Sequence, residues 1–327
     1  MNNENNILLE VQDLKKAFPV RKGLFQKVVG HVKAVDGVSF QIPEGKTFGL
    51  VGESGCGKTT VGKCVLGIFP ATEGKIIYEG KEIESFNERD MGKLRRELQM
   101  IFQDPYSSLD PRQSLNSILK EAIVCDKEKH TSAEIDARIN ELMTDVGLDP
   151  NMRDRYPHEL SGGQRQRLGI ARALACNPKL IVCDEPVSAL DVSIQAQVIN
   201  LLKELQVKRG ITYLFIAHDL AVVRNIADDI AVMYLGHIVE KMDAEGIFRN
   251  AMHPYTKALL SAVPITDYYE EKKRQRIILK GEVPSPKNVP SGCPFHPRCP
   301  YATDKCKQEN PVLTEREAGH FVACHNV

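Results

Sequence analysis

A glycine-rich loop that begins at residue 52 carries the residue types that bind phosphate. Gly52, Gly55 and Gly57 have no Cβ, so backbone N–H groups can turn inward and surround the α and β phosphates of a nucleotide. Lys58 would supply a point charge to the β and γ phosphates, and the hydroxyl of Thr59 would ligate Mg²⁺. The pattern therefore predicts a site for ATP and Mg²⁺. The other nucleotide-binding candidates of this segment are Glu53, Ser54, Cys56 and Thr60.

The flanking segments are those that such a loop requires. Residues 47–51 are apolar and predict a buried strand, and residues 59–63 open a helix. The N-terminus of that helix would face the phosphates, where its dipole favours anions. The strand, loop and helix together make a flexible glycine turn the weaker interpretation.

A pair of acidic residues follows a second apolar run. Residues 180–183 form a continuous apolar segment, as expected of a strand that is covered on both faces. Asp184 at its end would hold Mg²⁺, and Glu185 would polarise the water that attacks the γ phosphate. By itself the pair could be an ordinary strand end, but the phosphate loop favours the catalytic interpretation.

A third motif, Leu160-Ser161-Gly162-Gly163-Gln164, precedes this strand. In this order the three motifs resemble those of the ATP-binding subunit of an ABC transporter. The resemblance implies that Ser161, Gly162, Gly163 and Gln164 close over the γ phosphate held by a partner subunit. The active enzyme would then be a head-to-tail dimer with two ATP molecules. Ser161 as a simple helix cap is the competing interpretation.

The resemblance assigns further residues. It implies that Gln103 touches Mg²⁺ and senses the membrane partner, that His218 contacts the γ phosphate, and that residues 188–191 meet the opposite subunit. It also implies that Phe18 stacks on adenine. Phe25 and Phe40 are competitors for that role, but Phe40 alternates with apolar neighbours and is better explained as core.

Composition limits the class of protein. The chain has 327 residues, which is more than one domain usually contains, and its formal net charge is zero. A neutral chain argues against a nucleic-acid partner. We see no apolar run of the roughly 20 residues that span a bilayer and no export signal. The expected location is the cytoplasmic face of the cell membrane, peripherally bound through a partner.

The distribution of patterns predicts an α/β fold. Strands and turns alternate to about residue 95, residues 96–160 look helical, and strands and helices alternate again over residues 161–250. Thr131 and Glu134 form a capping-box pattern ahead of an apolar helical stripe. The expected fold is a P-loop ABC-type nucleotide-binding domain with a mainly parallel sheet, antiparallel strands near the N-terminus and a helical insertion. That domain would span residues 1–255, and a small irregular cysteine-rich tail would span residues 256–327.

Three segments narrow the resemblance to oligopeptide and dipeptide importers: residues 102–112, 253–260 and 281–286. The charged run of residues 270–276 between the last two is expected to be a solvated helix face or linker. The narrower resemblance implies import of di- or oligopeptides, two membrane permease subunits, a second and paralogous ATPase subunit, and an extracytoplasmic solute-binding protein. Import of nickel or another small solute remains an alternative. A soluble ABC ATPase of DNA repair or translation is a weaker one.

Four of the nine cysteines lie in the tail, with five, six and seventeen residues between them. A proline-rich segment with few apolar residues can hardly build a core, so these thiols indicate a structural metal site that holds the segment together. Four thiolates suit Zn²⁺ or a [4Fe–4S] cluster. The four cysteines lack the closely spaced C-x₂₋₄-C pairs typical of zinc sites, which favours the cluster, as does the resemblance. Free thiols, and mixed ligation with His296, His320 or His325, stay open. The proposed ligands are Cys293, Cys299, Cys306 and Cys324.

We expect the phosphate loop to be distant from this tail. Replacing one of the four cysteines should therefore loosen the tail while ATP binding survives. Loss of ATP binding would instead show that the tail supports the catalytic core.

Overall fold

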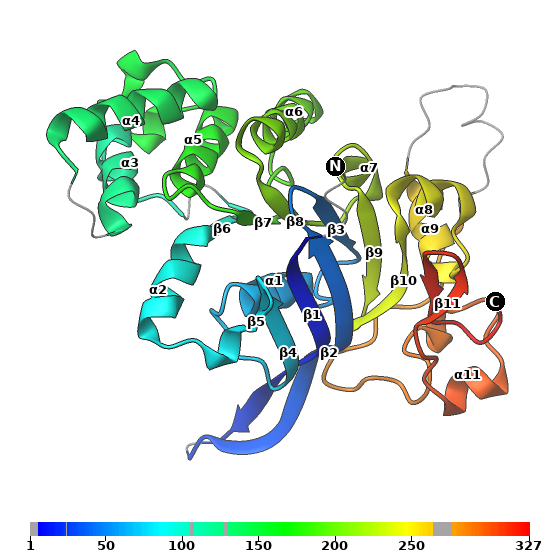
Figure 1. Cartoon of the computed structure of the whole chain (residues 1–327). Coiled ribbons are helices and arrows are strands. Elements are labelled where there is room, and N and C mark those ends of the chain that lie inside the picture. The colour runs from blue at the N-terminus through cyan, green and yellow to red at the C-terminus, as the bar shows by residue number, and fades with distance from the viewer. Residues whose placement is uncertain (1–5, 24, 105–107, 127–129, 264–275) are drawn as a thin grey trace, which may run out of the picture. The chain divides into compact units, whose positions relative to one another are not determined.

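The computed structural model describes residues 6–23, 25–104, 108–126, 130–263 and 276–327 (Figure 1). Most of the charged run 270–276, and residues 105–107 of the importer-like segment, lie outside these ranges. The chain divides into two compact units. The first comprises residues 1–6, 43–46 and 85–216, and the second comprises residues 7–42, 47–84 and 217–327.

The first unit contains three parallel strands. They are β6 (Leu98–Ile101), β7 (Leu180–Asp184) and β8 (Thr212–Ala217), of which β8 ends at the boundary of the unit. Strand β7 pairs with β6 on one side and β8 on the other, in register from Leu180 opposite Leu98 and Thr212. Every residue of β7 and β8 is buried, which confirms the prediction from their continuous apolar runs.

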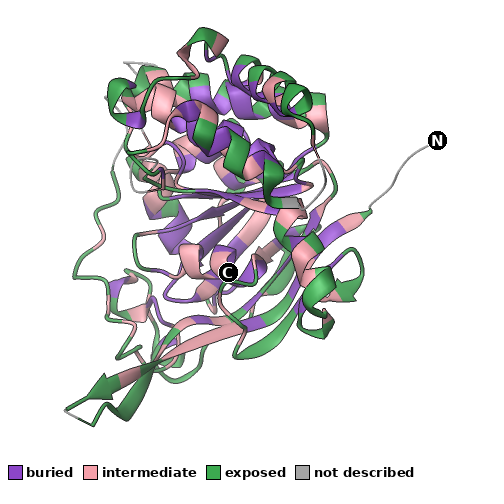
Figure 2. Cartoon of the chain, turned by 90° about the vertical axis from the view of Figure 1, so that its left-hand side faces the viewer, coloured by how far each residue is buried: buried purple, intermediate pink, exposed green. Residues whose placement is uncertain are grey.

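Helices make up the rest of the first unit, and buried residues alternate with exposed ones along them (Figure 2). The capping box predicted at Thr131 and Glu134 is confirmed, because each side chain bonds the other's backbone N–H. Gly210 ends the longest helix in the left-handed conformation, as its position predicts. The helices are α2 (Glu88–Glu97), α3 (Leu115–Ile123), α4 (Ser132–Asp145), α5 (Gly162–Leu174) and α6 (Val192–Arg209), with short 3₁₀ turns η2 (Val124–Asp126), η3 (Pro150–Met152) and η4 (Pro157–Glu159).

Two local expectations were wrong in this unit. The region expected to be helical from residue 96 begins with strand β6, and helix α2 lies where only strands and turns were expected. Asn87 begins α2 by accepting hydrogen bonds from the N–H groups of Arg89 and Asp90. Only Leu94 of this helix is buried. A helix with one buried position has no apolar period by which it could be recognised.

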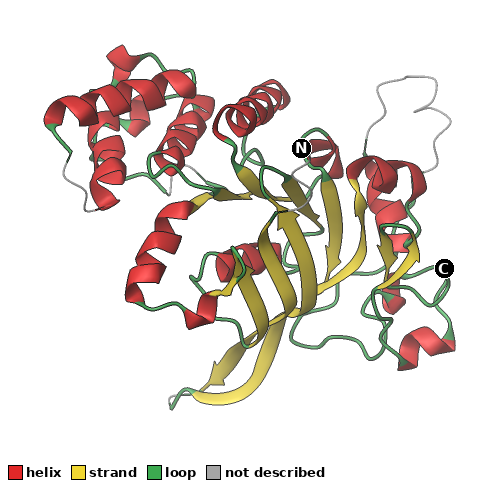
Figure 3. Cartoon of the chain, viewed as in Figure 1, coloured by secondary structure: helices red, strands yellow, loops and turns green. Residues whose placement is uncertain are grey.

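The second unit contains an antiparallel sheet built on a long hairpin, as expected for the N-terminal region. The strand order is β2-β1-β4-β5, and β1 pairs with β4 from Leu9 opposite Tyr78 (Figure 3). Its strands are β1 (Ile7–Lys22), β2 (Lys27–Pro43), β4 (Glu73–Tyr78) and β5 (Lys81–Glu82), and the 3₁₀ turn η1 (Ile83–Ser85) follows.

A second set of strands in this unit is mixed. Strand β3 (Thr47–Val51) pairs in parallel with β9 (Asp229–Tyr234), and β9 turns back into β10 (His237–Asp243) through Leu235 and Gly236. Both turn residues have positive φ, of 43° and 86°. Such a two-residue turn matches the strand twist and makes the pair antiparallel.

The tail is more regular than expected, because it also contains a hairpin. Strand β12 (His320–Val322) pairs antiparallel with β10, with Val322 opposite Glu240, and β11 (Thr314–Glu317) pairs with β12. The tail therefore adds two strands to the set formed by β3, β9 and β10. The helices of the second unit are α1 (Lys58–Val65), α7 (Leu220–Arg224), α8 (Ala244–Asn250), α9 (Pro254–Ala262), α11 (Asp304–Gln308) and the 3₁₀ turn η5 (His296–Arg298).

Candidate active site

The phosphate loop runs from the end of β3 to the start of α1, as predicted. Gly52 shows why this loop needs glycine. A Cβ at this position would lie 2.1 Å from the carbonyl oxygen of Met233, which belongs to the backbone of β9. Since a strand backbone cannot move aside, no larger residue fits between the loop and β9.

Lys58 points into the loop that precedes it. Its side chain is 4 % exposed, and its Nζ donates hydrogen bonds to the carbonyl oxygens of Gly52 (2.6 Å) and Glu53 (3.1 Å). The ammonium is therefore held by the same backbone segment that the sequence assigns to phosphate binding. This arrangement suits a lysine that exchanges carbonyl partners for phosphate oxygens.

Glu53 is the most constrained residue of this loop. Its backbone N–H donates to the hydroxyl of Tyr255 (3.0 Å), and its carboxylate accepts two hydrogen bonds from the guanidinium of Arg298, at 2.7 and 3.1 Å. This ion pair raises the pKa of Arg298 further, mainly through the hydrogen bond to Glu53. The expectation that the tail is distant from the phosphate loop was therefore wrong, because strand pairing and η5 bring Arg298 to Glu53.

A buried aromatic cluster supports both partners of Glu53. The ring of Phe295 lies 5.4 Å from that of Tyr255 and 5.3 Å from that of Tyr234, centroid to centroid. His253 begins α9 and accepts a hydrogen bond from the N–H of Tyr255. Burial lowers the pKa of His253 to about 3, so its ring is neutral in this cluster at neutral pH.

A buried contact between His320 and Glu240 attaches the tail hairpin. Nε2 of His320 lies 2.7 Å from Oε1 of Glu240, and both side chains are 0 % exposed. The carboxylate of Glu240 also accepts the backbone N–H groups of Met252 and His253. Glu240 thus joins β12 to the start of α9. The sequence pattern did not distinguish Glu240, and it offered His320 only as an alternative metal ligand.

The other candidates of the second unit are Phe18 and His218. Phe18, on β1, is half-buried and packs its ring edge against Phe69, with centroids 5.3 Å apart. The Nζ of Lys16 lies over the same ring, 5.1 Å from its centroid. The stacking role of Phe18 stays a prediction. His218 is exposed directly after β8, as its place after an apolar strand predicts. Phe40 is buried and stacks on Phe48, which confirms that it belongs to the core.

The acidic pair and Gln103 belong to the first unit. Asp184 is the last residue of β7 and is 5 % exposed. Glu185 follows with φ of 46°, a left-handed conformation that side chains rarely adopt, and its N–H donates to the carbonyl oxygen of Ile216. The amide of Gln103 donates to Oε2 of Glu185 at 3.0 Å. The structure thus brings together the predicted base and the predicted glutamine.

The signature segment begins helix α5. Ser161 is the N-cap: its hydroxyl accepts from the N–H of Gln164, and the side chain of Gln164 accepts from the N–H of Ser161. Ser161 therefore does cap helix α5, as the competing interpretation predicted. Because Ser161 is also exposed, a cap and a contact to a partner's nucleotide are compatible.

Each unit carries part of the predicted ATP site. The second holds Phe18, the phosphate loop from Gly52 to Thr60, and His218, and the first holds Gln103, Asp184, Glu185 and the segment Ser161–Gln164. These assignments rest on motif order and on the local geometry of each unit.

The four tail cysteines influence one another. Burial, and after it the neighbouring Cys306, Cys324 and Cys299, raise the pKa of Cys293 to about 11. The N–H of Cys293 also donates to the carbonyl oxygen of Cys306. In the parts of the chain that the structure describes, however, no three His, Cys, Asp or Glu side chains are arranged to hold a metal ion. The donor set suits a Cys₄ centre, and the ligand geometry gives the predicted cluster no support.

The tail histidines have other partners. Nε2 of His320 is bound to Glu240, Nδ1 of His296 lies 3.0 Å from the carbonyl oxygen of Cys293, and Nε2 of His325 lies 3.0 Å from that of Glu309. These contacts give each ring a structural role within the tail.

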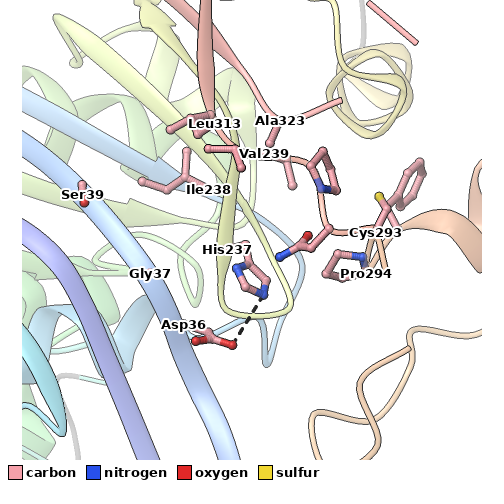
Figure 4. Close-up of a pocket in the computed structure, with 14 residues that line it drawn as sticks. Asp36, Gly37, Ser39, His237, Ile238, Val239, Cys293, Pro294, Leu313 and Ala323 are labelled. Carbon is pink, nitrogen blue, oxygen red and sulfur yellow. Dashed lines mark ion pairs between the residues drawn. The ribbon is translucent and has the colours of Figure 1, made fainter. Parts of the chain in front are cut away.

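A cavity of about 440 Å³ lies beside the tail in the second unit (Figure 4). Its polar side contains Asp36 and His237, whose Oδ2 and Nε2 are 3.9 Å apart, and its other side contains Cys293 and Pro294. Burial lowers the pKa of His237. No residue of the phosphate loop lines this cavity, so it is separate from the predicted nucleotide site.

No helix within the described ranges has the length and apolar character needed to cross a membrane.

Comparison with known families gives two matches. Residues 35–188 match the model of the ABC transporter family, and residues 239–306 match the model described as the oligopeptide/dipeptide transporter C-terminal region. The first range includes the phosphate loop, the signature segment and the acidic pair. The second includes β10 from Val239 onward, α9 and three of the four tail cysteines.

Individual proteins resemble the chain over nearly its whole length. It is 54 % identical over 319 residues to the oligopeptide transport ATP-binding protein AppF of Bacillus subtilis, covering 97 % of each chain. It is 49 % identical to the oligopeptide transport ATP-binding protein OppF of Salmonella typhimurium, covering 99 % of this chain and 97 % of that protein. Among solved structures, the dimeric post-hydrolysis ABC cassette MJ0796 with ADP and Pi superposes with a TM-score of 0.63 at 26 % identity. That match covers 72 % of this chain and 98 % of the cassette.

Proposed function

The chain belongs to the ATP-binding subunits of oligopeptide/dipeptide ABC transporters, and from this premise we propose that it hydrolyses ATP to drive import of short peptides through a membrane transporter. The observation that carries the proposal is the peptide-transporter match over residues 239–306, which follows the ABC match in the same chain. The ABC match accounts for ATP hydrolysis, and the C-terminal match accounts for the class of solute.

The residues of the second unit would bind the nucleotide. The loop from Gly52 to Thr60 surrounds the phosphates with backbone N–H groups, Lys58 adds its positive charge, and Phe18 stacks on the base. Mg²⁺, when bound, neutralises phosphate charge, and Thr59, Gln103 and Asp184 would hold it. The contacts of Lys58 with two loop carbonyls support this assignment, because the ammonium already lies within the loop.

Glu185 would act as the general base for the attacking water. Its strained backbone conformation and its hydrogen bond to Gln103 orient the carboxylate. Gln103 would link that carboxylate to the membrane partner, and His218 would contact the γ phosphate. Removing the base should stop hydrolysis without preventing ATP binding.

The test is Glu185→Gln in the assembled transporter. We expect ATP to bind normally and turnover to fall roughly 10²- to 10⁴-fold, the range for loss of a general base. Lys58→Ala is the comparison variant, and it should weaken binding itself. Hydrolysis by Glu185→Gln at close to the wild-type rate would show that another group is the base.

We further propose that the signature segment acts on ATP held by a second ATPase subunit, a paralogue of this chain. The capping boxes at Ser161 and Thr131 provide a matched test, because these two residues cap α5 and α4 in the same way. Ser161→Ala and Thr131→Ala should each cost about 1 kcal/mol of stability. Only Ser161→Ala should also reduce hydrolysis by the dimer. Equal activities of the two variants would leave Ser161 as a cap alone.

The remaining partners follow from the same premise. We propose two membrane permease subunits that place the chain at the cytoplasmic face of the membrane, and an extracytoplasmic binding protein that selects the solute. Purification with the permease subunits tests the assembly. Binding of peptides to that receptor supports peptide import, whereas binding of nickel or another small solute redefines the cargo.

For the tail, we propose that residues 256–327 follow an ABC domain of residues 1–255, and that Cys293, Cys299, Cys306 and Cys324 hold one [4Fe–4S] cluster. The residue types and the hydrogen bond from the N–H of Cys293 to the carbonyl oxygen of Cys306, which places two of the four cysteines next to each other, support the proposal. Such a centre would order a segment with few apolar residues. Anaerobically purified protein should contain about four irons per chain. One zinc per chain would replace the cluster with a structural zinc site, and metal-free protein would leave the cysteines as thiols.

A further inference from the structure

Three side chains hold Glu53, and two of them come from beyond residue 250. The hydroxyl of Tyr255 accepts its backbone N–H, and the guanidinium of Arg298 binds both oxygens of its carboxylate. The third group is Lys58, which donates to its carbonyl oxygen. Glu53, the residue that follows Gly52 in the phosphate loop, is therefore held in place by Tyr255 and Arg298.

The Arg298–Glu53 pair is shielded and specific. The side chain of Arg298 is 7 % exposed and that of Glu53 is 29 % exposed. Two parallel N–H···O bonds fix the angle of the carboxylate as well as its distance, which a single-point contact cannot do. Removing the arginine would leave a partly buried carboxylate without its main partner.

The position of Glu53 determines the shape of the loop. Its carbonyl oxygen accepts from Lys58 Nζ at 3.1 Å and from the N–H of Cys56 at 3.3 Å. A shift of Glu53 would therefore displace the lysine and the turn together. In addition, a carboxylate that has lost its guanidinium would repel the negative charges of a polyphosphate bound to the same loop.

Arg298 is in turn placed by the fold of the tail. It ends the turn η5, where its N–H donates to the carbonyl oxygen of Phe295, and Phe295 is 1 % exposed within the aromatic cluster. Cys299 follows directly, and Cys293 lies just ahead of the turn. An ordered tail is thus the condition for a correctly placed arginine.

We propose that Arg298 is a positioning residue for ATP binding: through Glu53, the tail holds the phosphate loop in its nucleotide-binding shape. This inference rests on the proposed role of the loop. It gives the C-terminal region a direct part in nucleotide affinity, and it makes loss of tail structure a cause of weaker ATP binding.

The first experiment measures ATP affinity of the full chain by titration calorimetry. Arg298→Gln should weaken ATP binding roughly tenfold, within the range of ordinary coupling between sites. Arg316→Gln is the matched control, because Arg316 is a tail guanidinium that donates to the carbonyl oxygen of Cys324 and has no contact with the loop among the described residues. Equal affinities of the two variants would overturn the proposal. Lys58→Ala tests the proposed nucleotide site itself. If this variant binds ATP normally, the assignment of the phosphate loop fails as well as the role of Arg298.

A rescue experiment distinguishes positioning from general damage. If Arg298 acts through Glu53, the double variant Glu53→Gln/Arg298→Gln should bind ATP more tightly than Arg298→Gln alone, because the unpaired carboxylate is gone. Arg298→Lys should restore only part of the affinity, since an ammonium cannot bind both oxygens in parallel. A double variant that binds no better than the single one contradicts an effect through Glu53.

A measurement on chains with intact Arg298 covers the case in which Arg298→Gln does not fold. By reciprocity, ATP that orders the loop must also stabilise the groups that hold it. Added ATP should therefore slow amide hydrogen exchange in residues 293–299, and Glu53→Gln should lose that protection. Exchange that is unchanged by saturating ATP in the wild-type chain would overturn the proposal.

Discussion

Two regions of the second unit meet at Glu53 and are built in opposite ways. The phosphate loop is a local structure, in which one short segment joins β3 to α1 and its own carbonyls hold Lys58. The tail is held by long-range contacts: β12 on β10, His320 on Glu240, and Arg298 on Glu53. A local structure depends on backbone geometry at single positions, whereas the tail depends on buried partners far away in the sequence. The two should therefore respond to different kinds of change.

The largest effect is expected where the loop touches β9. Gly52→Ala places a Cβ 2.1 Å from a backbone oxygen and should abolish ATP binding, with a loss of about 3 kcal/mol or more in the free energy of unfolding. Gly55→Ala is the control, because no atom lies within 4 Å of its Cβ and only its left-handed φ of 79° is unfavourable. It should cost about 1–2 kcal/mol. Similar ATP affinities of the two variants would show that close approach is not what the loop requires.

The next effect concerns the attachment of the tail. Glu240→Met leaves His320 and two buried N–H groups without their acceptor and should destabilise the second unit by about 3 kcal/mol. Limited proteolysis should then cut the tail first. Glu245→Met, an exposed glutamate on α8, should change stability by less than about 0.5 kcal/mol. A tail that stays resistant in Glu240→Met would show that the hairpin alone attaches it.

A smaller effect should appear with pH. Burial lowers the pKa of His253 from 6.5 to about 3. The contribution of its neutral ring to the free energy of unfolding is therefore complete above pH 6.5 and is lost as pH falls toward 3. At pH 5 the loss should be about 2 kcal/mol. His253→Asn keeps an acceptor for the N–H of Tyr255 and should flatten this part of the pH profile, measured by urea unfolding. His158→Asn, at an exposed histidine, should leave it unchanged.

Identical pH profiles of the wild-type chain and His253→Asn would mean that the aromatic cluster accommodates a charged imidazole.

How much of this could be predicted differs between the two regions. The phosphate loop, strands β3, β7 and β8 and the capping box at Thr131 follow from patterns within short segments, and the structure confirms these elements. Helix α2 was missed because it buries only Leu94, and β6 was missed because four residues give too short a pattern. The tail hairpin was missed for a related reason: β12 has three residues, and its partner β10 is far away in the sequence.

The sequence by itself determined which residues are predicted to carry the chemistry, because glycine and lysine at fixed spacing bind phosphate through local geometry, and the acidic pair follows a recognisable buried strand. Only the tertiary structure decided what holds them. The contact of Arg298 with Glu53 and that of His320 with Glu240 each join segments with no common pattern. Charged side chains give no period from which a partner could be predicted. Their pairing is set by where the folded backbone places them and by the high cost of burying either charge alone.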